Sequence, residues 1–155
     1  MVQGASLQIL TNRYTGMLNS SSLMKKEQAI LALIKDISNL LNTKLSGAYF
    51  RENNLLEDFI TSYGLPELSY YSPYSLEDQG IVSNLIKDCL IRFEPRLMDI
   101  SVRSIPQTDS MTFHYKINGV IEFESTLLPL VLNSTINTIS KEIRLTQELG
   151  GKYGL

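Results

Sequence analysis

The stretch LIKDCLIRFEPRLMDISV, residues Leu85–Val102, contains the point at which the hydrophobic period of this sequence changes. Before Pro95, apolar residues recur at the spacing of one helix face: Ile81, Val82, Leu85, Ile86, Cys89, Leu90 and Phe93. After Pro95, Met98, Ile100 and Val102 alternate with polar residues, which is typical of a half-buried strand. Because the residue before a proline is disfavoured in the α region, we expect the helix to end there and a strand to follow.

Two further helices are expected upstream. Residues 26–42 carry a single apolar stripe, formed by Ile30, Leu33, Ile34, Ile37, Leu40 and Leu41. A short helix is expected over 54–62 and is stopped near Gly64. The loop that follows carries three tyrosines, which either pack over the helices or form a binding surface: Tyr70, Tyr71 and Tyr74. Ser75 then provides an N-cap for the helix that ends at the proline, with Asp78 in the capping-box position.

Downstream of the junction the period stays at two. Alternation continues through Met111, Phe113, Tyr115 and Ile117. Asn118-Gly119 predicts a two-residue hairpin turn, since both positions tolerate positive φ, with a returning strand over 120–124. Another strand is expected over 128–136, with Pro129 placing its start at an edge. Residues 137–148 fit either a turn and a last short strand or a terminal helix.

Helices followed by antiparallel strands indicate an α+β fold, with two to three N-terminal helices packed on a small antiparallel sheet. Residues 1–24 are polar with little periodicity, so we expect an N-terminal extension, partly ordered at best, and a single domain over 25–155. The edge of such a sheet is a template for strand addition. The hairpin 111–124 and the strand 130–136 are both candidates for that edge.

Composition excludes several classes of function. The 155 residues carry a formal net charge of −2 with no basic run, so nucleic-acid binding is not indicated. One cysteine and one histidine rule out a disulfide framework within the chain and a histidine-based metal cluster. The N-terminus lacks the pattern of a secretory signal, and the longest apolar runs are too short to span a bilayer.

No familiar catalytic motif is present. The sequence contains no phosphate-binding glycine loop, no GxSxG and no HExxH. His114 lies on the polar face of a predicted strand and is expected at the surface, while Cys89 lies in an apolar stripe as a small hydrophobe. Glycoside hydrolysis would need two carboxyl groups across a cleft. No spacing pairs any two of the candidates, which are Glu67, Glu94, Asp99, Glu122 and Glu124.

The tripeptide Glu94-Pro95-Arg96 carries opposite charges at the helix–strand junction. A cation two residues from Glu94 favours the ionised carboxylate, which is the wrong direction for a general acid. In extended chain, side chains at i and i+2 point the same way, so Glu94 and Arg96 can form one charged spot. Either the chain bends at Leu97 or the pair lies at the rim of an apolar face. The residue types leave a local salt bridge and a docking site equally open.

Several segments together resemble the TssE family of type VI secretion baseplates. They are IKDISNLLNT (34–43), YGLPEL (63–68), FEPRL with MDISV (93–102), and FHYKINGVIEF (113–123). The resemblance covers about residues 30–145. Phage members of this superfamily of contractile-tail wedge proteins often carry a Gly-Glu-Arg motif after the first helix. The corresponding segment here, LSGAYFREN, lacks it, which favours the secretion branch.

The resemblance implies a structural role without catalytic residues or cofactors. The expected fold is similar to the interlocking domain of contractile sheath subunits. The expected partners are the larger wedge proteins TssF and TssG and the sheath proteins TssB and TssC, in a cytoplasmic baseplate docked at the membrane, with no nucleic acid and no direct membrane insertion. By position, sheath docking falls on Glu94, Pro95 and Arg96. The alternatives are a lysozyme-like, peptidoglycan-cleaving enzyme and a phage-tail-like baseplate wedge protein.

Overall fold

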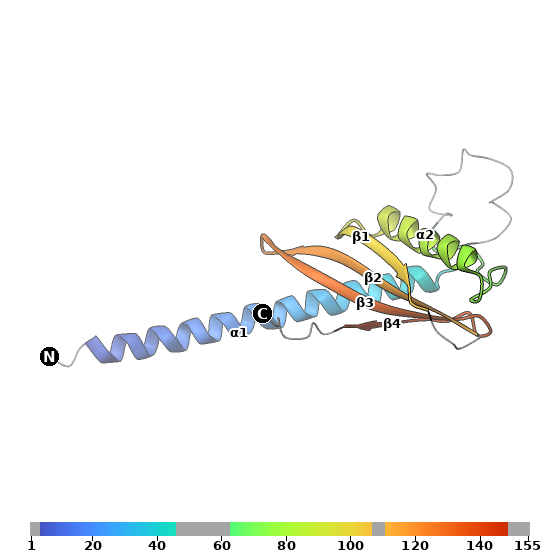
Figure 1. Ribbon diagram of the computed structural model, residues 1–155. Coiled ribbons are helices and arrows are strands. Elements are labelled where there is room, and N and C mark those ends of the chain that lie inside the picture. The colour runs from blue at the N-terminus through green and yellow to red at the C-terminus, as the bar shows by residue number, and fades with distance from the viewer. Residues whose placement is uncertain (1–3, 46–62, 107–110, 149–155) are drawn as a thin grey trace. The chain divides into compact units, whose positions relative to one another are not determined.

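The computed structural model describes residues 4–45, 63–106 and 111–148, and over 4–20 it describes the backbone alone. The chain divides into two compact units, Met1–Leu33 and Ile34–Leu155. Within the described ranges the elements are two helices followed by a four-stranded antiparallel sheet (Figure 1). The α+β prediction is therefore confirmed. The short helix expected over 54–62 lies outside the described residues.

Helix α1, Gly4–Asn42, begins 22 residues before the start that its apolar stripe predicted at residue 26. The segment upstream contains no proline and includes alanine, leucine, methionine and glutamine, which are good helix formers. Once the stripe over 26–42 has nucleated a helix, each added residue is gained without a new nucleus, so the helix extends through this segment. The predicted boundary between an extension and a domain at residue 24 stays a prediction.

Helix α2, Leu76–Phe93, has the boundaries that its capping residues predicted. The Ser75 hydroxyl accepts a hydrogen bond from the backbone N–H of Asp78 at 3.2 Å. The Asp78 carboxylate accepts a hydrogen bond from the N–H of Ser72 at 2.8 Å, while the N–H of Ser75 donates to the carbonyl oxygen of Ser72. The reciprocal half of the predicted capping box is therefore not formed. Glu94 caps the C-terminus, and its N–H donates to the carbonyl oxygen of Leu90 at 2.9 Å.

The sheet is a meander in which each strand pairs with the next along the chain (Figure 1). Its strands are β1 Leu97–Ser104, β2 Thr112–Phe123, β3 Thr126–Asn137 and β4 Ile143–Gln147. One face supplies much of the core, which also takes apolar side chains from both helices. The core includes Ile37, Leu40, Leu41, Val82, Ile86, Leu90, Phe113, Tyr115, Ile117, Leu130, Leu132 and Ile136. Residues 137–148 form a turn and a last strand, the first of the two predicted alternatives.

The hairpin turn predicted at Asn118-Gly119 is wrong. Both residues lie inside β2, opposite Val131 and Leu130 of β3, and the turn is made by Glu124 and Ser125 at φ of 47° and 62°. The buried alternation of β2 continues through position 119. A side chain at that position would crowd β1, because its Cβ would lie 2.5 Å from Cδ1 of Leu97. This glycine permits a close approach between strands, so the segment expected to return over 120–124 is the second half of β2.

The two segments proposed as free edges, 111–124 and 130–136, belong to interior strands, and the edges of the sheet are β1 and β4. The α2 residue Ser83 donates its hydroxyl to the carbonyl oxygen of Val102 on β1 at 2.7 Å. On β4, the side-chain amide of Asn42 bonds both backbone groups of Ile143, accepting from its N–H and donating to its C=O, each at 2.9 Å. Both edges are thus partly capped by helix residues.

Pro129 lies where β3 has only one neighbour. Its partner across the ladder with β2 is Val120, whereas β4 pairs only with Leu132–Ile136 of β3. Within the described residues this end of β3 is a local edge, as the proline predicted.

Strand β1 departs from simple alternation. Leu97 and Ile100 are buried, while Met98 and Asp99 between them are exposed. The pairing with β2 shifts between Met98 and Ser101, and Asp99 adopts a φ of 50°, which identifies a β-bulge. The prediction that Met98 shares a buried face with Ile100 is wrong, because the bulge inserts an extra residue between them.

None of the helices in the described ranges has the length and hydropathy needed to cross a membrane.

Candidate docking site

The Glu94-Pro95-Arg96 tripeptide forms the turn between α2 and β1. The carbonyl oxygen of Glu94 accepts from the N–H of Leu97 at 3.1 Å, and a Glu94 carboxylate oxygen accepts from the N–H of Arg96 at 3.3 Å. The proline in between has a fixed φ, so the two charged residues are held on one tight turn. Leu97 is buried immediately after it, which places the bend at the start of β1.

Glu94 and Arg96 form a bidentate ion pair. Nε of Arg96 lies 2.7 Å from Oε1 of Glu94, and Nη2 lies 2.8 Å from Oε2. The two side chains differ in exposure, since Glu94 is 4% exposed as a residue and the Arg96 side chain is 53% exposed. Bidentate arginine–carboxylate pairs have fixed geometry as well as short hydrogen bonds. The buried Glu94 therefore fixes the orientation of the more exposed Arg96 side chain. The local salt bridge, one of the two predicted alternatives, is present.

A third residue, Asp36 of α1, completes the arrangement. Its Oδ2 atom lies 2.6 Å from Nη2 of Arg96, and its side chain is half-exposed. Hydrogen bonds from Glu94 first, and from Asp36 second, raise the pKa of the Arg96 guanidinium, which stays charged. The sequence analysis missed Asp36, which lies 60 residues from Arg96. The available signal was an acidic residue directly before Ile37, at the border of the apolar stripe.

The guanidinium of Arg96 keeps hydrogen-bonding capacity after these contacts. Of its five N–H groups, the one on Nε and the two on Nη2 point to the two carboxylates. The two on Nη1 have no partner among the residues that the structure describes. An exposed cation with fixed orientation and two unused donors can bind a carboxylate of another protein in a defined geometry.

Three of the residues considered as catalytic candidates, Glu94, Cys89 and His114, have surroundings that the structure describes. Both carboxylate oxygens of Glu94 accept hydrogen bonds from Arg96, so both are already occupied within the chain. Burial raises the pKa of the Cys89 thiol to about 12, which makes it a poor nucleophile. Its sulfur donates to the carbonyl oxygen of Gly64 at 3.5 Å. His114, expected at the surface, is half-buried, and its Nε2 atom has no partner in the described part of the chain.

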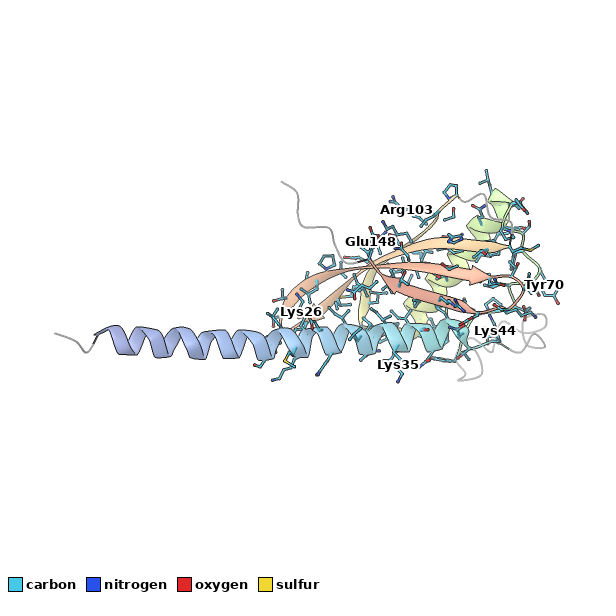
Figure 2. The ribbon with its side chains drawn as sticks, turned by 90° about the horizontal axis from the view of Figure 1, so that it is seen from below. Lys26, Lys35, Lys44, Tyr70, Arg103 and Glu148 are labelled. Carbon is cyan, nitrogen blue, oxygen red and sulfur yellow. The ribbon has the colours of Figure 1, made fainter. Side chains whose placement is uncertain are left out.

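Two of the loop tyrosines project from the surface. Tyr70 is exposed (Figure 2). Tyr74 is also exposed, while Tyr71 is half-buried. The interpretation that the loop tyrosines pack over the helices is wrong for these two. Within the described ranges, no group of three or more potential metal ligands of the His, Cys, Asp or Glu type lies together.

Comparison with known protein families matches residues 28–125 to the family described as baseplate wedge protein gp25. The matched segment begins in α1, contains α2, β1 and β2, and ends at the turn before β3. It includes Asp36, Glu94 and Arg96. Comparisons with curated proteins and with solved structures gave no significant match. Because the family match spans well over half of the 155 residues, the chain belongs to the gp25 family of baseplate wedge proteins.

Proposed function

We propose that this protein is a non-enzymatic structural component of a type VI secretion baseplate wedge. In this role it binds the larger wedge subunits TssF and TssG and connects the baseplate to the first TssB–TssC layer of the contractile sheath. Membership of the gp25 family supports a structural role among other baseplate components. The choice of the secretion branch rests on the segments that resemble TssE and on LSGAYFREN, which lacks the phage Gly-Glu-Arg motif. The expected location is the cytoplasm, within a baseplate assembly docked at the membrane.

The observation that carries this proposal is the orientation of Arg96. Glu94 and Asp36 hold its guanidinium through Nε and Nη2, and Nη1 has no partner among the described residues. In the proposed complex, Arg96 contacts an acidic group of the sheath. Glu94 is a positioning residue, because it is 4% exposed and both its oxygens are already occupied. Pro95 keeps the turn rigid.

Fold stability alone gives a weak reason for this arrangement. The outer pair of Arg96 and Asp36 is half-exposed, and exposed ion pairs contribute about 0–1 kcal/mol. Burying the Glu94 carboxylate carries a desolvation penalty that its pairing with Arg96 must first offset. An apolar residue of similar size at position 94 would fill the same space without that penalty. The arrangement is easier to explain as a means of presenting one arginine to a partner.

The edge of β4 supports attachment by strand addition. In an antiparallel strand, alternate residues direct their backbone groups to the same side, and those of Ile143 face Asn42 and not β3. The backbone groups of Leu145 and Gln147 therefore face the same outer side. No partner for them is present within the described residues, so this end of the edge can accept a strand from a sheath subunit.

The test is sheath assembly in the native bacterium, with Arg96→Lys as the main variant. Lysine keeps the charge and one ion pair with Glu94, but it lacks the planar fork that contacts both carboxylates and still presents free donors. We expect purified Arg96→Lys to melt within a few degrees of the wild type, and cells carrying it to assemble no fluorescent sheaths. The matched control is Arg103→Ala, which removes an exposed arginine of β1 (Figure 2) and should leave sheaths normal.

Two outcomes would overturn this proposal. Normal sheath numbers in the Arg96→Lys strain would show that the fork is not needed for docking. Loss of sheaths together with loss of folding, and rescue of both by growth at lower temperature, would show that the residue serves only the fold. Asp36→Asn adds a second measurement, since it breaks only the exposed pair. With the orientation of Arg96 loosened, we expect fewer sheaths and an unchanged melting temperature.

A further inference from the structure

The face of the sheet away from the core carries an apolar patch. Along β3, Leu127, Pro129 and Val131 alternate with core-facing residues, so their side chains point to this face. Val120 of β2 lies opposite Pro129, and Met98 of β1 lies opposite Val120. Leu127 is 64% exposed and Met98 is 37% exposed. We call these five residues the outer patch, since a contiguous group of this kind on a surface marks a place where something binds.

The last described residue, Glu148, lies at the border of the outer patch. Its backbone N–H donates to the carbonyl oxygen of Val131, a member of the patch, at 2.9 Å. Its carboxylate lies 2.7 Å from Nζ of Lys116 on β2. Lys116 and Val120 point to the same face, because they are an even number of residues apart in one strand. The Glu148 side chain therefore lies on the face that carries the patch, and the residues after it begin there.

The hydrogen bonds between β3 and the continuation of β4 cannot all be made beyond this point. In an antiparallel ladder, alternate residues of a strand bond to the same neighbour, so the position that follows Val131 in the ladder is Pro129. A proline has no N–H to donate. The residue that would lie opposite it is Gly150, and Gly151 follows. Because glycine permits a change of direction, the chain can leave the edge of β3 here and cross onto the face of the sheet.

We propose that residues 149–155 of this chain fold over the outer patch and cover it with the side chains of Tyr153 and Leu155. The segment is long enough, because extended chain rises about 3.3 Å per residue and five residues span about 16 Å. Leu127 lies about 13 Å from Val131 along β3, and β1 lies about 10 Å from β3 across the sheet. This inference is independent of the proposed function, since it concerns contacts within one chain.

Charge and tethering favour this occupant over another chain. Glu122 is exposed and lies opposite Leu127 at the rim of the patch, where it can pair with Lys152 of the same segment. A segment tethered at Glu148 has an effective concentration of the order of millimolar, so contacts too weak to hold a separate protein suffice. A strand added by another protein at this part of the β3 edge would lack the same hydrogen bond from Pro129.

The experiment measures how fast hydrogen peroxide oxidises the Met98 thioether to the sulfoxide in the full chain, followed by mass spectrometry of its peptide. The variant Tyr153→Ser/Leu155→Ser removes the two covering side chains. The matched control is Tyr74→Ser, since Tyr74 is 69% exposed in the loop before α2. We expect oxidation of Met98 to be at least about threefold faster in the double variant than in the wild type or the control. Met111, which is 50% exposed before the other end of β2, should be oxidised at one rate in all three proteins.

Three outcomes would overturn this inference. Equal oxidation rates of Met98 in the wild type and the double variant would show that the segment does not cover it. Faster oxidation of Met98 and Met111 together would show that the substitutions loosen the fold as a whole. Protection of Met98 in the wild type that is lost on dilution would assign the outer patch to a second copy of the chain. Protection that is independent of protein concentration and lost only in the double variant supports the proposal.

Discussion

Replacing Gly119 by alanine tests the close approach of β2 to β1. The new Cβ would lie 2.5 Å from Cδ1 and 2.8 Å from Cγ of Leu97, and 3.2 Å from the backbone oxygen of Met98. Carbon atoms in favourable contact lie about 3.5–4.0 Å apart. Leu97 is 4% exposed, so its side chain has no open space to turn into. Either the two strands separate locally or Leu97 leaves its preferred rotamer.

The size of the effect follows from two opposing contributions. Forcing an extra methyl group into a packed site costs about 1–3 kcal/mol. Alanine also restricts the unfolded chain more than glycine does, which returns about 0.4–1 kcal/mol to the folded state. We therefore expect Gly119→Ala to lower the free energy of unfolding by about 1–2 kcal/mol. For a chain of this length, that corresponds to a fall of about 2–8 °C in the melting temperature.

Urea unfolding followed by circular dichroism measures this difference, and Gly80→Ala is its matched control. Gly80 lies in α2, where an added Cβ meets no atom within 4 Å. There alanine should stabilise the helix by about 0.5–1 kcal/mol. In a Leu97→Ala background the cost of Gly119→Ala should shrink, because the atoms it meets are gone. If Gly119→Ala stabilises the protein as Gly80→Ala does, the close-approach explanation is refuted.

Three further predictions concern the rest of the fold. Gly64→Ala should lower the free energy of unfolding by about 3 kcal/mol or more, measured by urea unfolding, since φ is +113° and the new Cβ would meet the backbone oxygen of Thr43. Asn42→Ala should cost about 1–3 kcal/mol and speed hydrogen exchange at the Ile143 amide, because that amide loses its acceptor; unchanged exchange would contradict it. Between pH 9 and 12 the Cys89 thiol stays protonated in the folded chain but ionises in the unfolded one, so stability should fall as pH rises, by up to about 1.4 kcal/mol per pH unit. Cys89→Ala should flatten that slope, and an equal slope in both proteins would refute the assignment.

Local signals predicted the elements whose limits are set by neighbouring residues. Helix α2 begins after Ser75 and ends before Pro95 because a cap and a proline act within one helical turn. The hairpin turn was misplaced because its position depends on a distant contact. Asn118-Gly119 satisfies the turn conformation, but the glycine is needed where Leu97 approaches, and the turn falls on two residues without a strong turn signature, Glu124 and Ser125.

In the candidate site, too, contacts between residues close in sequence could be predicted and contacts between distant residues could not. Glu94 and Arg96 could be paired from sequence because they carry opposite charges two residues apart, although the structure brings them together on a tight turn and not in extended chain as predicted. Their unequal burial could not be predicted, since it depends on how the end of α2 packs. Asp36 could not be found by any local rule, because the contact joins positions 60 residues apart. The sheath-docking role of the tripeptide stays a proposal.

The hydrogen bonds between the side-chain amide of Asn42 and the backbone of Ile143 have a consequence for the order of folding. Its two hydrogen bonds join positions 101 residues apart in the chain. Contacts of such long sequence separation form late, because the loop they close must lose its entropy first. A nascent chain can build α2 and the β1–β2 ladder before β4 has been synthesised, but the end of α1 then still lacks its backbone partner. Pairing of β4 is thus the last step of folding. A chain truncated before Ile143 would retain the β1–β2 and β2–β3 ladders, but the end of α1 would lack its hydrogen bonds to the sheet.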